Sequence, residues 1–566
     1  MAKQKIQMSN RRKFLKSVTL GGLGISLLDP LKKNNQTNPV GNFIESSTVS
    51  KSRKITLLQT TDVHCQIHPH DELFWENEQM VFRKTAGYAH LSTLLKTHRK
   101  SNANTFIVDT GDMFQGSMLS IKTRGGAFID ILNQLGYDLY LPGNWEVVYH
   151  KERMQELLGG LDAPKVCANM YHDLGDGQKG ELIFPAYYTM VKEGIKIGFL
   201  GYTDHLVPIR QSPLYSKGIV YTKPEENLKY YVDVLKKQEQ CDYIIILAHI
   251  GLSQQIYLAN LPACEGVNYI FGGDTHERVR KPIQCTYAKV VEPGAFGSFV
   301  GKLELTVLDG KIIDEQYELL EVKPDRYKAD KEMTHLISNL EQDYIQSINT
   351  IHGYSKVPLY RYFVVENTID TMIIDALMWR AKTDIVLSNG FRFCPPRIAD
   401  HTGMVPITEG FIVDMLPVDA PVRTGIVTGQ QIKDWLEKEL QNVFAKDASK
   451  RFGGWVVKMK GMAIEFKAHE DVNKRVQKIE VNGQSIELSK EYSVTACERE
   501  GDPEDTLCRI PSVKNPRNLD FTLHQVMRDY LHSFSPVNPV PHHNVVVLDA
   551  PQTLLSQVFG VDYKFV

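Results

Sequence analysis

Five short apolar segments recur along the first half of the chain, and each is followed by polar residues that can bind a metal ion. They span residues 54–60, 105–109, 138–141, 243–247 and 268–271. A short, continuous apolar run bounded by polar residues is typical of a strand that is buried on both faces. Stretches with helical periodicity separate these runs, at residues 86–98, 127–135, 151–158 and 225–237. Strands that alternate with helices predict an α/β fold with largely parallel strands.

The polar segments after these runs carry carboxylates, imidazoles and one carboxamide. These residues are Asp62, His64, Asp112, Asn144, His249, Asp274 and His276. One of them alone is usually a cap or a turn former, but open α/β sheets place their sites at the carboxyl ends of strands. Divalent ions that activate water for ester hydrolysis need such groups close together, with one carboxylate shared. The pattern predicts a two-metal hydrolase, and Asp112, on a tight turn after Gly111, is suited to bridge the ions.

The length of the chain, 566 residues, exceeds what one hydrophobic core normally supports. We expect a first domain over residues 54–325, a linking helix within 326–354, a second domain over 355–550 and a tail over 551–566. The net charge of −2, with basic and acidic residues well mixed, gives no evidence for binding to nucleic acid or to an anionic membrane. The expected partner is a small molecule or another protein, and we expect a monomer.

The N-terminus predicts export. Two adjacent arginines, Arg11 and Arg12, precede Phe14-Leu15-Lys16 and a short apolar run over residues 18–28. This pattern resembles a twin-arginine signal, which we place at residues 1–30, and the run is too short for a stable membrane span. Residues 31–53 lack apolar periodicity and are expected to form a tether. The expected location is therefore the periplasm or cell envelope. The eight cysteines show no metal or disulfide framework, so free thiols are the default expectation.

The order of the polar motifs resembles that of the calcineurin-like metallophosphoesterases, and specifically of the two-domain 5'-nucleotidase family. The shared pattern is Asp-x-His, Gly-Asp, Gly-Asn-x-Glu, a His after a strand, and Gly-Gly-x-x-His. Residues 290–297 resemble the segment that follows the last metal motif in the family, and residues 387–392 resemble the start of the family's C-terminal domain. The resemblance implies a metallophosphoesterase domain of mixed β-sheets sandwiched with helices, followed by an α+β substrate domain.

The resemblance also implies how two divalent ions are held. One ion would be bound by Asp62, His64, Asp112 and His276, and the other by Asp112, Asn144, His249 and Asp274. A hydroxide that bridges the ions would be the nucleophile, which makes Asp112, Asn144 and Trp145 the expected catalytic residues. Manganese is the expected metal, and zinc, iron or magnesium are alternatives.

Two substitutions separate this chain from the nucleotidases at the metal motifs. Nucleotidases have Gly-Asn-His-Glu-Phe-Asp where this chain has Trp145 for the His and Val148 for the Asp, so an imidazole that stabilises the transition state and its carboxylate partner are missing. Asp274 stands where the family has the His of Gly-Gly-His, which exchanges a neutral ligand for an anionic one. A carboxylate still binds manganese, iron or magnesium, so the resemblance leaves Asp274 as an expected ligand.

A third departure concerns the nucleoside. Nucleotidases clamp the base between two aromatic rings, which two segments of the C-terminal domain carry. By resemblance, the corresponding segments of this chain are Pro417-Val418 and residues 500–504, and neither has an aromatic residue. Because stacking supplies much of the affinity for a base, this difference argues against a nucleoside substrate.

The thiosulfohydrolase branch of the family fits better. Gly143-Asn144-Trp145-Glu146, residues 388–392 and residues 453–462 are similar to motifs of that branch, which uses two manganese ions to cleave a sulfonate group from a cysteine-bound carrier arm. The resemblance implies a small anionic substrate or a thiosulfonate-bearing carrier protein, bound with the help of Asn389 and Arg392. A structural ion pair is an equally good interpretation of Arg392. Asp274 departs from this branch as well.

Three functions stay open from the sequence. The first is a thiosulfohydrolase-like hydrolase that acts on a sulfur- or phosphorus-centred ester. The second is a 5'-nucleotidase or phosphomonoesterase with a rebuilt pocket. The third is a catalytically silent binding protein that keeps the fold.

Overall fold

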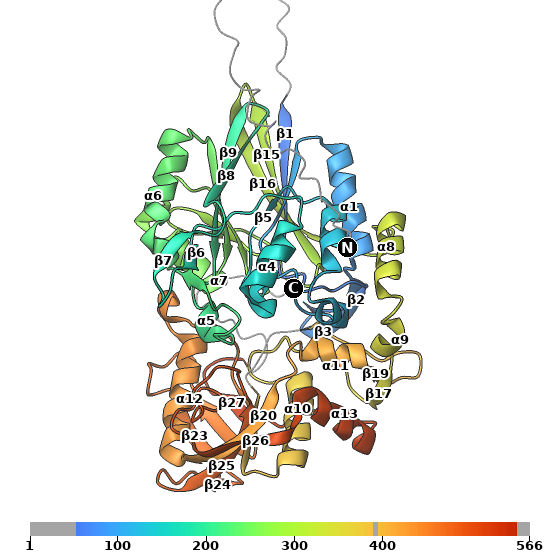
Figure 1. The fold of residues 1–566 in the computed structure, drawn as a ribbon, viewed down its shortest axis with the longest axis vertical. Coiled ribbons are helices and arrows are strands. Elements are labelled where there is room, and N and C mark those ends of the chain that lie inside the picture. The colour runs from blue at the N-terminus through green and yellow to red at the C-terminus, as the bar shows by residue number, and fades with distance from the viewer. Residues whose placement is uncertain (1–51, 389–393, 552–566) are drawn as a thin grey trace, which may run out of the picture. The chain divides into compact units, whose positions relative to one another are not determined.

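The computed structural model describes residues 52–388 and 394–551, which belong to one compact unit. Several predicted features lie outside these described residues: the signal, the tether up to residue 51, Asn389, Arg392 and the tail after residue 551. Two mixed β-sheets, flanked by helices, form the core of an N-terminal lobe over residues 53–321 (Figure 1). A C-terminal lobe over residues 351–547 carries smaller sheets and four longer helices.

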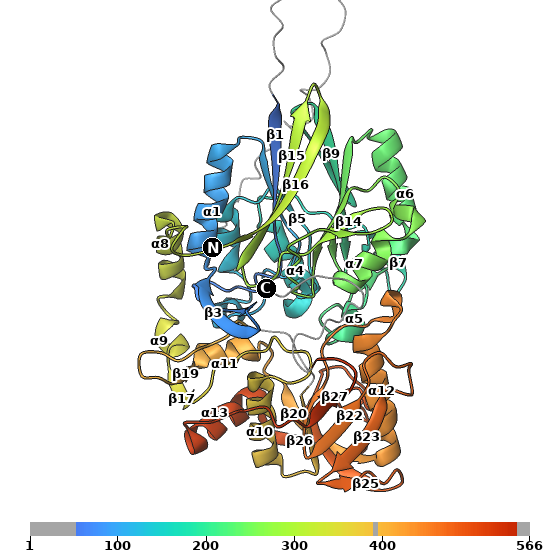
Figure 2. The same cartoon turned by 180° about the vertical axis from the view of Figure 1, so that it is seen from behind.

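The first sheet of the N-terminal lobe has the strand order β16-β15-β1-β4-β5. Its strands are β1 (Arg53–Thr60), β4 (Thr105–Asp109), β5 (Leu139–Tyr140), β15 (Phe299–Leu308) and β16 (Lys311–Glu321). β1, β4 and β5 are parallel, whereas β15 pairs antiparallel with β1. The long strands β1, β15 and β16 lie side by side in Figure 2. Helices α1 (Tyr88–Ser101), α2 (Met118–Thr123) and α3 (Phe128–Leu135) connect these strands, and α4 (His150–Gly159) follows β5. A hairpin of β2 (His70–Glu76) and β3 (Gln79–Thr85) follows β1.

The second sheet has the order β13-β14-β12-β11-β9-β8. Its strands are β8 (Tyr187–Lys192), β9 (Ile195–Thr203), β11 (Tyr243–His249), β12 (Tyr269–Gly273), β13 (Ile283–Gln284) and β14 (Lys289–Val291). The central strands are parallel, and every residue of β11 is buried, as expected for a strand covered on both faces. Helices α5 (Val207–Arg210), α6 (Leu228–Asp233) and α7 (Leu252–Ala259) belong to this half, with a small sheet of β6 (Met170–Asp173), β7 (Lys179–Leu182) and β10 (Ile219–Tyr221).

Helices α8 (Lys331–Glu341) and α9 (Ile345–Ile348) lead into the C-terminal lobe, and α8 packs against α1. The main sheet of this lobe has the order β21-β18-β25-β20-β26, from β18 (Ile385–Ser388), β20 (Pro421–Thr428), β21 (Lys458–Lys460), β25 (Glu491–Cys497) and β26 (Lys514–Thr522). A second sheet joins β22 (Met462–Phe466), β23 (Val476–Val481), β24 (Gln484–Ser485) and β27 (Val545–Val547), while β17 (Ile351–Ser355) pairs with β19 (Val405–Thr408). The helices are α10 (Thr368–Ala381), α11 (Glu409–Met415), α12 (Gly429–Phe444) and α13 (Leu523–Phe534).

The α/β architecture of mixed sheets followed by an α+β lobe is confirmed. The parallel order is incomplete, because β15 and β16 add antiparallel strands on one side of the first sheet, and β8 and β13 add them at the two edges of the second. The predicted linking helix is divided into α8 and α9, and the predicted helix over residues 225–237 ends in a π-helical turn, Val234–Gln238. All eight cysteines lie within the described residues and are free thiols. No described helix is long and apolar enough to cross a membrane.

Candidate metal centre

The predicted ligand residues lie at the carboxyl ends of parallel strands from both sheets. Asp62 and His64 follow β1, Asp112 follows β4, Asn144 follows β5, His249 ends β11, and Asp274 and His276 follow β12. Buried parallel strands deliver loops to the same edge of a sheet, so segments that are more than 200 residues apart in the sequence meet here.

The backbone at this edge adopts a conformation that side-chain-bearing residues rarely occupy. The φ angle is 49° at Asp62, 50° at His64, 64° at Asp112, 87° at Asp274 and 58° at His276. Such residues persist only where surrounding contacts hold them, and they cluster at functional sites. The holding contacts are visible: the Asp62 N–H donates to Gly111 O at 2.9 Å, and the His64 N–H donates to Asp112 O at 3.0 Å.

One group of ligand atoms comes from Asp62, His64 and His276. Nε2 of His64 lies 3.1 Å from Nε2 of His276, and Nε2 of His276 lies 3.4 Å from Oδ1 of Asp62. Nδ1 of His64 contacts the carbonyl oxygen of Gln115 at 3.0 Å. With the proton on Nδ1, that hydrogen bond leaves the Nε2 lone pair facing its neighbours, which is the usual arrangement of a metal-binding histidine.

A second group comes from Asp62, Asp112 and His249. Oδ2 of Asp112 lies 3.2 Å from Nε2 of His249 and 3.7 Å from Nε2 of His64, so this carboxylate reaches both groups. Nδ1–H of His249 donates to Thr110 O at 2.6 Å, which directs Nε2 toward the carboxylates. Asp62 belongs to both groups, so it could contact two ions as Asp112 could, whereas the resemblance gave the bridging role to Asp112 alone.

Two buried atoms at the second group fit a metal ion. Nε2 of His249 and Oδ1 of Asn144 are buried and make no hydrogen bond to any part of the chain that the structure describes. A buried acceptor without a partner is costly, and a divalent cation would satisfy both lone pairs. Carboxylate, imidazole and carboxamide ligands suit the divalent ions expected here, so the residues present fit a two-ion centre.

Electrostatics favour positive charge at the same place. Burial would lower the pKa of His249, but the carboxylates of Asp112 and Asp62 raise it well above its ordinary value. Burial raises the pKa of Asp112 to about 8, with His249 acting in the opposite direction. The carboxylates of Asp62 and Asp112 therefore attract a cation. A metal ion bound here would displace the proton of the His249 imidazole.

Trp145 and Glu146 brace the Asp112 turn. The backbone N–H of Trp145 donates to Oδ1 of Asp112 at 2.8 Å. The Glu146 carboxylate accepts from the N–H groups of Met113 at 2.8 Å and Asp112 at 3.2 Å, and from the Tyr140 hydroxyl at 3.1 Å. A Cβ at Gly143 would lie 2.3 Å from Oδ1 of Asp112, so only glycine fits before Asn144. The sequence singled out the Gly-Asn-x-Glu motif, but not this role of Glu146.

Replacing Glu146 by glutamine is expected to weaken Mn²⁺ binding by about 10–100-fold, the usual cost of losing a side chain that orients ligands. Glutamine presents one donor group to backbone N–H groups that need acceptors. Calorimetric titration of Mn²⁺ measures the effect. The matched control is Tyr140→Phe, which removes one hydrogen bond worth about 1 kcal/mol and keeps both backbone contacts of Glu146. Unchanged affinity in Glu146→Gln would contradict the bracing role.

Sequence reasoning did not find two further residues at the centre. Arg210, the last residue of α5, donates from Nη1 to Oδ2 of Asp274 and to Oδ2 of Asp204, both at 3.0 Å. Glu292 accepts from the Thr275 hydroxyl at 2.9 Å and the Glu277 N–H at 2.8 Å, which fixes the loop that carries His276. Glu292 lies in the segment that resembles the one after the family's last metal motif, so this resemblance could have indicated Glu292 as a residue of the centre. Arg210 lies in no motif.

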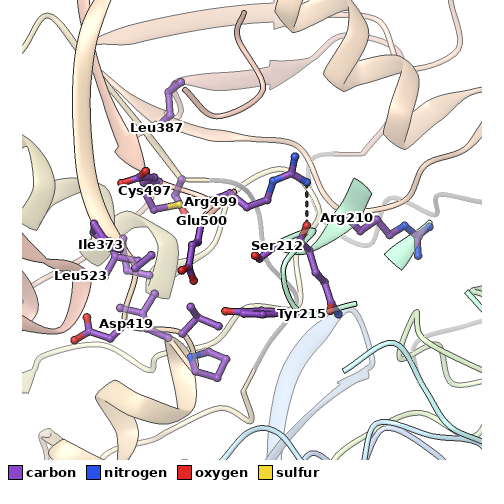
Figure 3. Close-up of a pocket in the computed structure, with 18 of the residues that line it drawn as sticks. Arg210, Ser212, Tyr215, Ile373, Leu387, Asp419, Cys497, Arg499, Glu500 and Leu523 are labelled. Atoms are coloured by element: carbon purple, nitrogen blue, oxygen red, sulfur yellow. Dashed lines mark hydrogen bonds between the residues drawn. The ribbon is translucent and has the colours of Figure 1, made fainter. Parts of the chain in front are cut away.

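A cavity of about 270 Å³ lies beside the metal centre, between segments of the two lobes (Figure 3). Trp145 and Arg210, which contact Asp112 and Asp274, both line it. Its other walls are mainly apolar, from residues such as Ile373, Leu377, Leu416, Val418 and Leu523. Arg499, at one wall in Figure 3, donates to the carbonyl oxygen of Gln211 at 3.3 Å and so ties the lobes together.

The two segments that correspond to the base-binding segments of the nucleotidases both line this cavity. Pro417, Val418 and Glu500 line it, as the resemblance implies for the substrate pocket. Among the described residues that line it, the aromatic ones are Trp145 and Tyr215, and both belong to the N-terminal lobe. Ser388, the last described residue before Asn389, is also part of the wall.

The fold and the two groups of converging ligand atoms define a metal-dependent hydrolase of the two-lobed α/β class. Residues 55–278 match the sequence model of the calcineurin-like phosphoesterases, and residues 348–497 match that of the 5'-nucleotidase C-terminal domain. The chain belongs to this family of metal-dependent phosphoester hydrolases.

Relatives of known sequence and structure agree with this family. The chain is 23% identical to the 5'-nucleotidase of Vibrio cholerae over 536 residues, which cover 86% of this chain and 92% of that protein. It is 24% identical to a trifunctional nucleotide phosphoesterase of Bacillus subtilis, over 71% of this chain and 30% of that protein. Among solved structures, the sulfate thiohydrolase of Thermus thermophilus superposes with a TM-score of 0.77 at 21% identity, over 88% of this chain and 98% of that one. A 5'-nucleotidase precursor from the same species gives 0.74 at 22%, over 88% and 100%.

Proposed function

We propose that the protein is an exported hydrolase, similar to the thiosulfohydrolases, that uses two divalent ions, with manganese expected, to cleave a small sulfur- or phosphorus-centred ester other than a nucleotide. The observation that carries the proposal is the position of Trp145. Its side chain lines the cavity next to the metal centre, and its backbone N–H donates to Asp112. The nucleotidases have an imidazole at this position.

The indole of Trp145 limits the leaving group. Its Nε1–H is a donor only and does not release a proton at neutral pH, whereas an imidazole can both stabilise charge and transfer a proton. A leaving group at this wall must therefore depart without help from residue 145. A thiolate, whose conjugate acid has a pKa of about 8.5, departs readily as an anion, but an alkoxide does not. The site thus favours cleavage at a bond to sulfur.

The walls of the cavity support a substrate without a base. Stacking on an aromatic ring contributes about 1–3 kcal/mol per base. Pro417, Val418 and Glu500 offer no aromatic ring at the positions where the nucleotidases place theirs, and the aromatic lining residues Trp145 and Tyr215 belong to the other lobe. The apolar side chains around them suit an aliphatic leaving group.

The protein's own residues would bind the two ions and separate them from the leaving group. Two bound divalent ions would supply Lewis acidity and an activated water. Asp62 and Asp112 reach both groups of ligand atoms, and both are almost fully buried. Trp145 lines the cavity beside the centre, so we expect its side chain to lie between the leaving group and the ligands.

Sulfate release tests the proposal. The Mn²⁺-loaded chain is given a peptide whose cysteine sulfur carries a sulfonate group, and AMP and p-nitrophenyl phosphate are assayed in parallel. We expect sulfate release from the peptide at a higher kcat/KM than phosphate release from AMP, and its loss in Asp112→Asn. An Mn²⁺-loaded protein that releases neither sulfate from the peptide nor phosphate from p-nitrophenyl phosphate would overturn the proposal.

Export is part of the proposal and is tested separately. The adjacent arginines Arg11 and Arg12 support the twin-arginine route. Replacing both by lysine is expected to keep the protein in the cytoplasm, as cell fractionation would show. Export of the double variant at the wild-type level would contradict this route.

A 5'-nucleotidase or phosphomonoesterase is the second candidate. It is favoured by the match to the Vibrio cholerae 5'-nucleotidase over 92% of that protein. AMP turnover above that of the thiosulfonate peptide, and lost in Asp112→Asn, would establish it. A chain that binds fewer than two ions and turns over no substrate would instead support the silent binding protein.

A further inference from the structure

The inference concerns Asp274, which stands where the family has a histidine ligand. Its backbone N–H donates to both carboxylate oxygens of Asp62, at 3.2 and 3.1 Å. Its Oδ1 accepts from Nδ2 of Asn144 at 3.3 Å, and its Oδ2 accepts from Nη1 of Arg210 at 3.0 Å. Both side-chain oxygens are therefore already engaged by donors from the protein. Neither group of converging ligand atoms includes Asp274.

Arg210 fixes Asp274 from the outer side. Its side chain is only 14% exposed and lies between two carboxylates, Asp204 and Asp274, each 3.0 Å from Nη1. Nη2 donates to the carbonyl oxygen of Phe452 in the C-terminal lobe. A buried guanidinium with these partners offsets the negative charge that an aspartate adds at this position.

Asn144 is fixed in turn by Asp274. A carboxylate accepts hydrogen bonds, so it must face the NH₂ group of the carboxamide. With Nδ2 turned toward Asp274, Oδ1 of Asn144 is turned away from it, and this buried oxygen has no hydrogen-bond partner among the described residues. Nε2 of His249, which lies 3.2 Å from Oδ2 of Asp112, is the other buried ligand atom of the second group that makes no hydrogen bond to the described residues.

We propose that Asp274 is a positioning residue and not a metal ligand: held by Arg210, it orients Asn144 so that Oδ1 of the carboxamide faces the second ion. The chain Arg210–Asp274–Asn144 thus replaces the bond that a histidine would make to the metal. A second ion, when bound, would then have one protein ligand fewer than the family pattern provides. This role concerns metal loading and is independent of the substrate proposed above.

A double-mutant cycle on Mn²⁺ affinity tests the proposal. Calorimetry gives the two dissociation constants of the wild type, Asp274→Leu, Asn144→Ala and the double variant. We expect Asp274→Leu to weaken the second ion by about 10–100-fold and to leave the first ion unchanged. Because Asp274 acts through Asn144, the double variant should match Asn144→Ala within about twofold. A further loss of tenfold or more in the double variant would mean that Asp274 is itself a ligand.

A crystal structure of the Mn²⁺-loaded full chain decides the question even where Asn144→Ala binds too weakly for calorimetry. We expect Oδ1 of Asn144 at about 2.2 Å from the second ion, with the Asp274 carboxylate beyond about 3 Å and still bonded to Arg210. An Asp274 oxygen at a bonding distance from the ion would overturn the proposal. Arg210→Met, which leaves Asp274 in place, should also weaken the second ion about tenfold, and unchanged affinity would count against the chain of contacts.

Discussion

Replacing Asp112 by asparagine is expected to lower kcat by at least about a thousandfold, because metal polarisation of the reacting group is worth several kcal/mol and each 1.4 kcal/mol is a factor of ten. Oδ2 of Asp112 lies 3.2 Å from Nε2 of His249 and 3.7 Å from Nε2 of His64, so this substitution would disturb both groups of ligand atoms. Asparagine keeps the shape but loses the negative charge that two cations share. Steady-state kinetics with the best substrate measures the loss.

Metal analysis of the same variant separates binding from chemistry. We expect fewer than two Mn²⁺ ions per chain in Asp112→Asn and two in the wild type. Asp314→Asn is the matched control, because Asp314 lies exposed on β16 and, in the described residues, its side chain accepts a hydrogen bond from Gln316. A loss of activity below tenfold in Asp112→Asn, with both ions retained, would contradict a bridging role for this carboxylate.

The sequence was informative about the centre because its ligands follow buried strands. The apolar runs that became β1, β4, β11 and β12 end within two residues of their predicted limits, and the ligand-bearing loops start there. Parallel strands must present these loops at one edge, so the meeting of Asp62, Asp112 and His249 followed from topology.

The contacts between loops could not be predicted in the same way. Arg210 is 64 residues from Asp274 in the sequence, on a four-residue helix with no distinctive pattern. Nothing in its neighbourhood distinguishes it from an exposed arginine, and only the fold places it between Asp204 and Asp274. The positive φ angles of Asp62 and Asp274 depend on the same tertiary contacts.

The C-terminal lobe shows a related limit. Pro417, Val418 and Glu500 were located only through a family resemblance, because their segments have no periodicity that marks a pocket. The cavity arises where these segments meet Trp145 and Arg210 from the other lobe. Such a surface is a property of packing between distant segments, so local sequence patterns do not encode it.

Restoring the nucleotidase motif with Trp145→His and Val148→Asp is expected to raise kcat/KM for an alkyl phosphate by about 100-fold, the usual effect of one preorganised charge-stabilising group. Val148 and Trp145 belong to one turn, since the Val148 N–H donates to Trp145 O at 3.0 Å. An aspartate at residue 148 can therefore support an imidazole at residue 145. Thiosulfonate cleavage should fall at the same time, because the smaller imidazole opens the wall between the metal centre and the cavity.

The leaving group decides what the new imidazole does. If the imidazole helps the leaving oxygen to depart, the gain should be larger for glycerol phosphate than for p-nitrophenyl phosphate, because nitrophenolate is already stable as an anion. Trp145→Phe is the matched control: it keeps an aromatic wall without a donor, and thiosulfonate turnover should stay within about tenfold, or 1.4 kcal/mol. Equal gains for both phosphates would assign the imidazole a purely electrostatic role, and no gain for either would mean that Trp145 is not what separates this chain from the phosphomonoesterases. A loss of thiosulfonate turnover in Trp145→Phe as large as in the double variant would show that the indole N–H itself contacts the substrate.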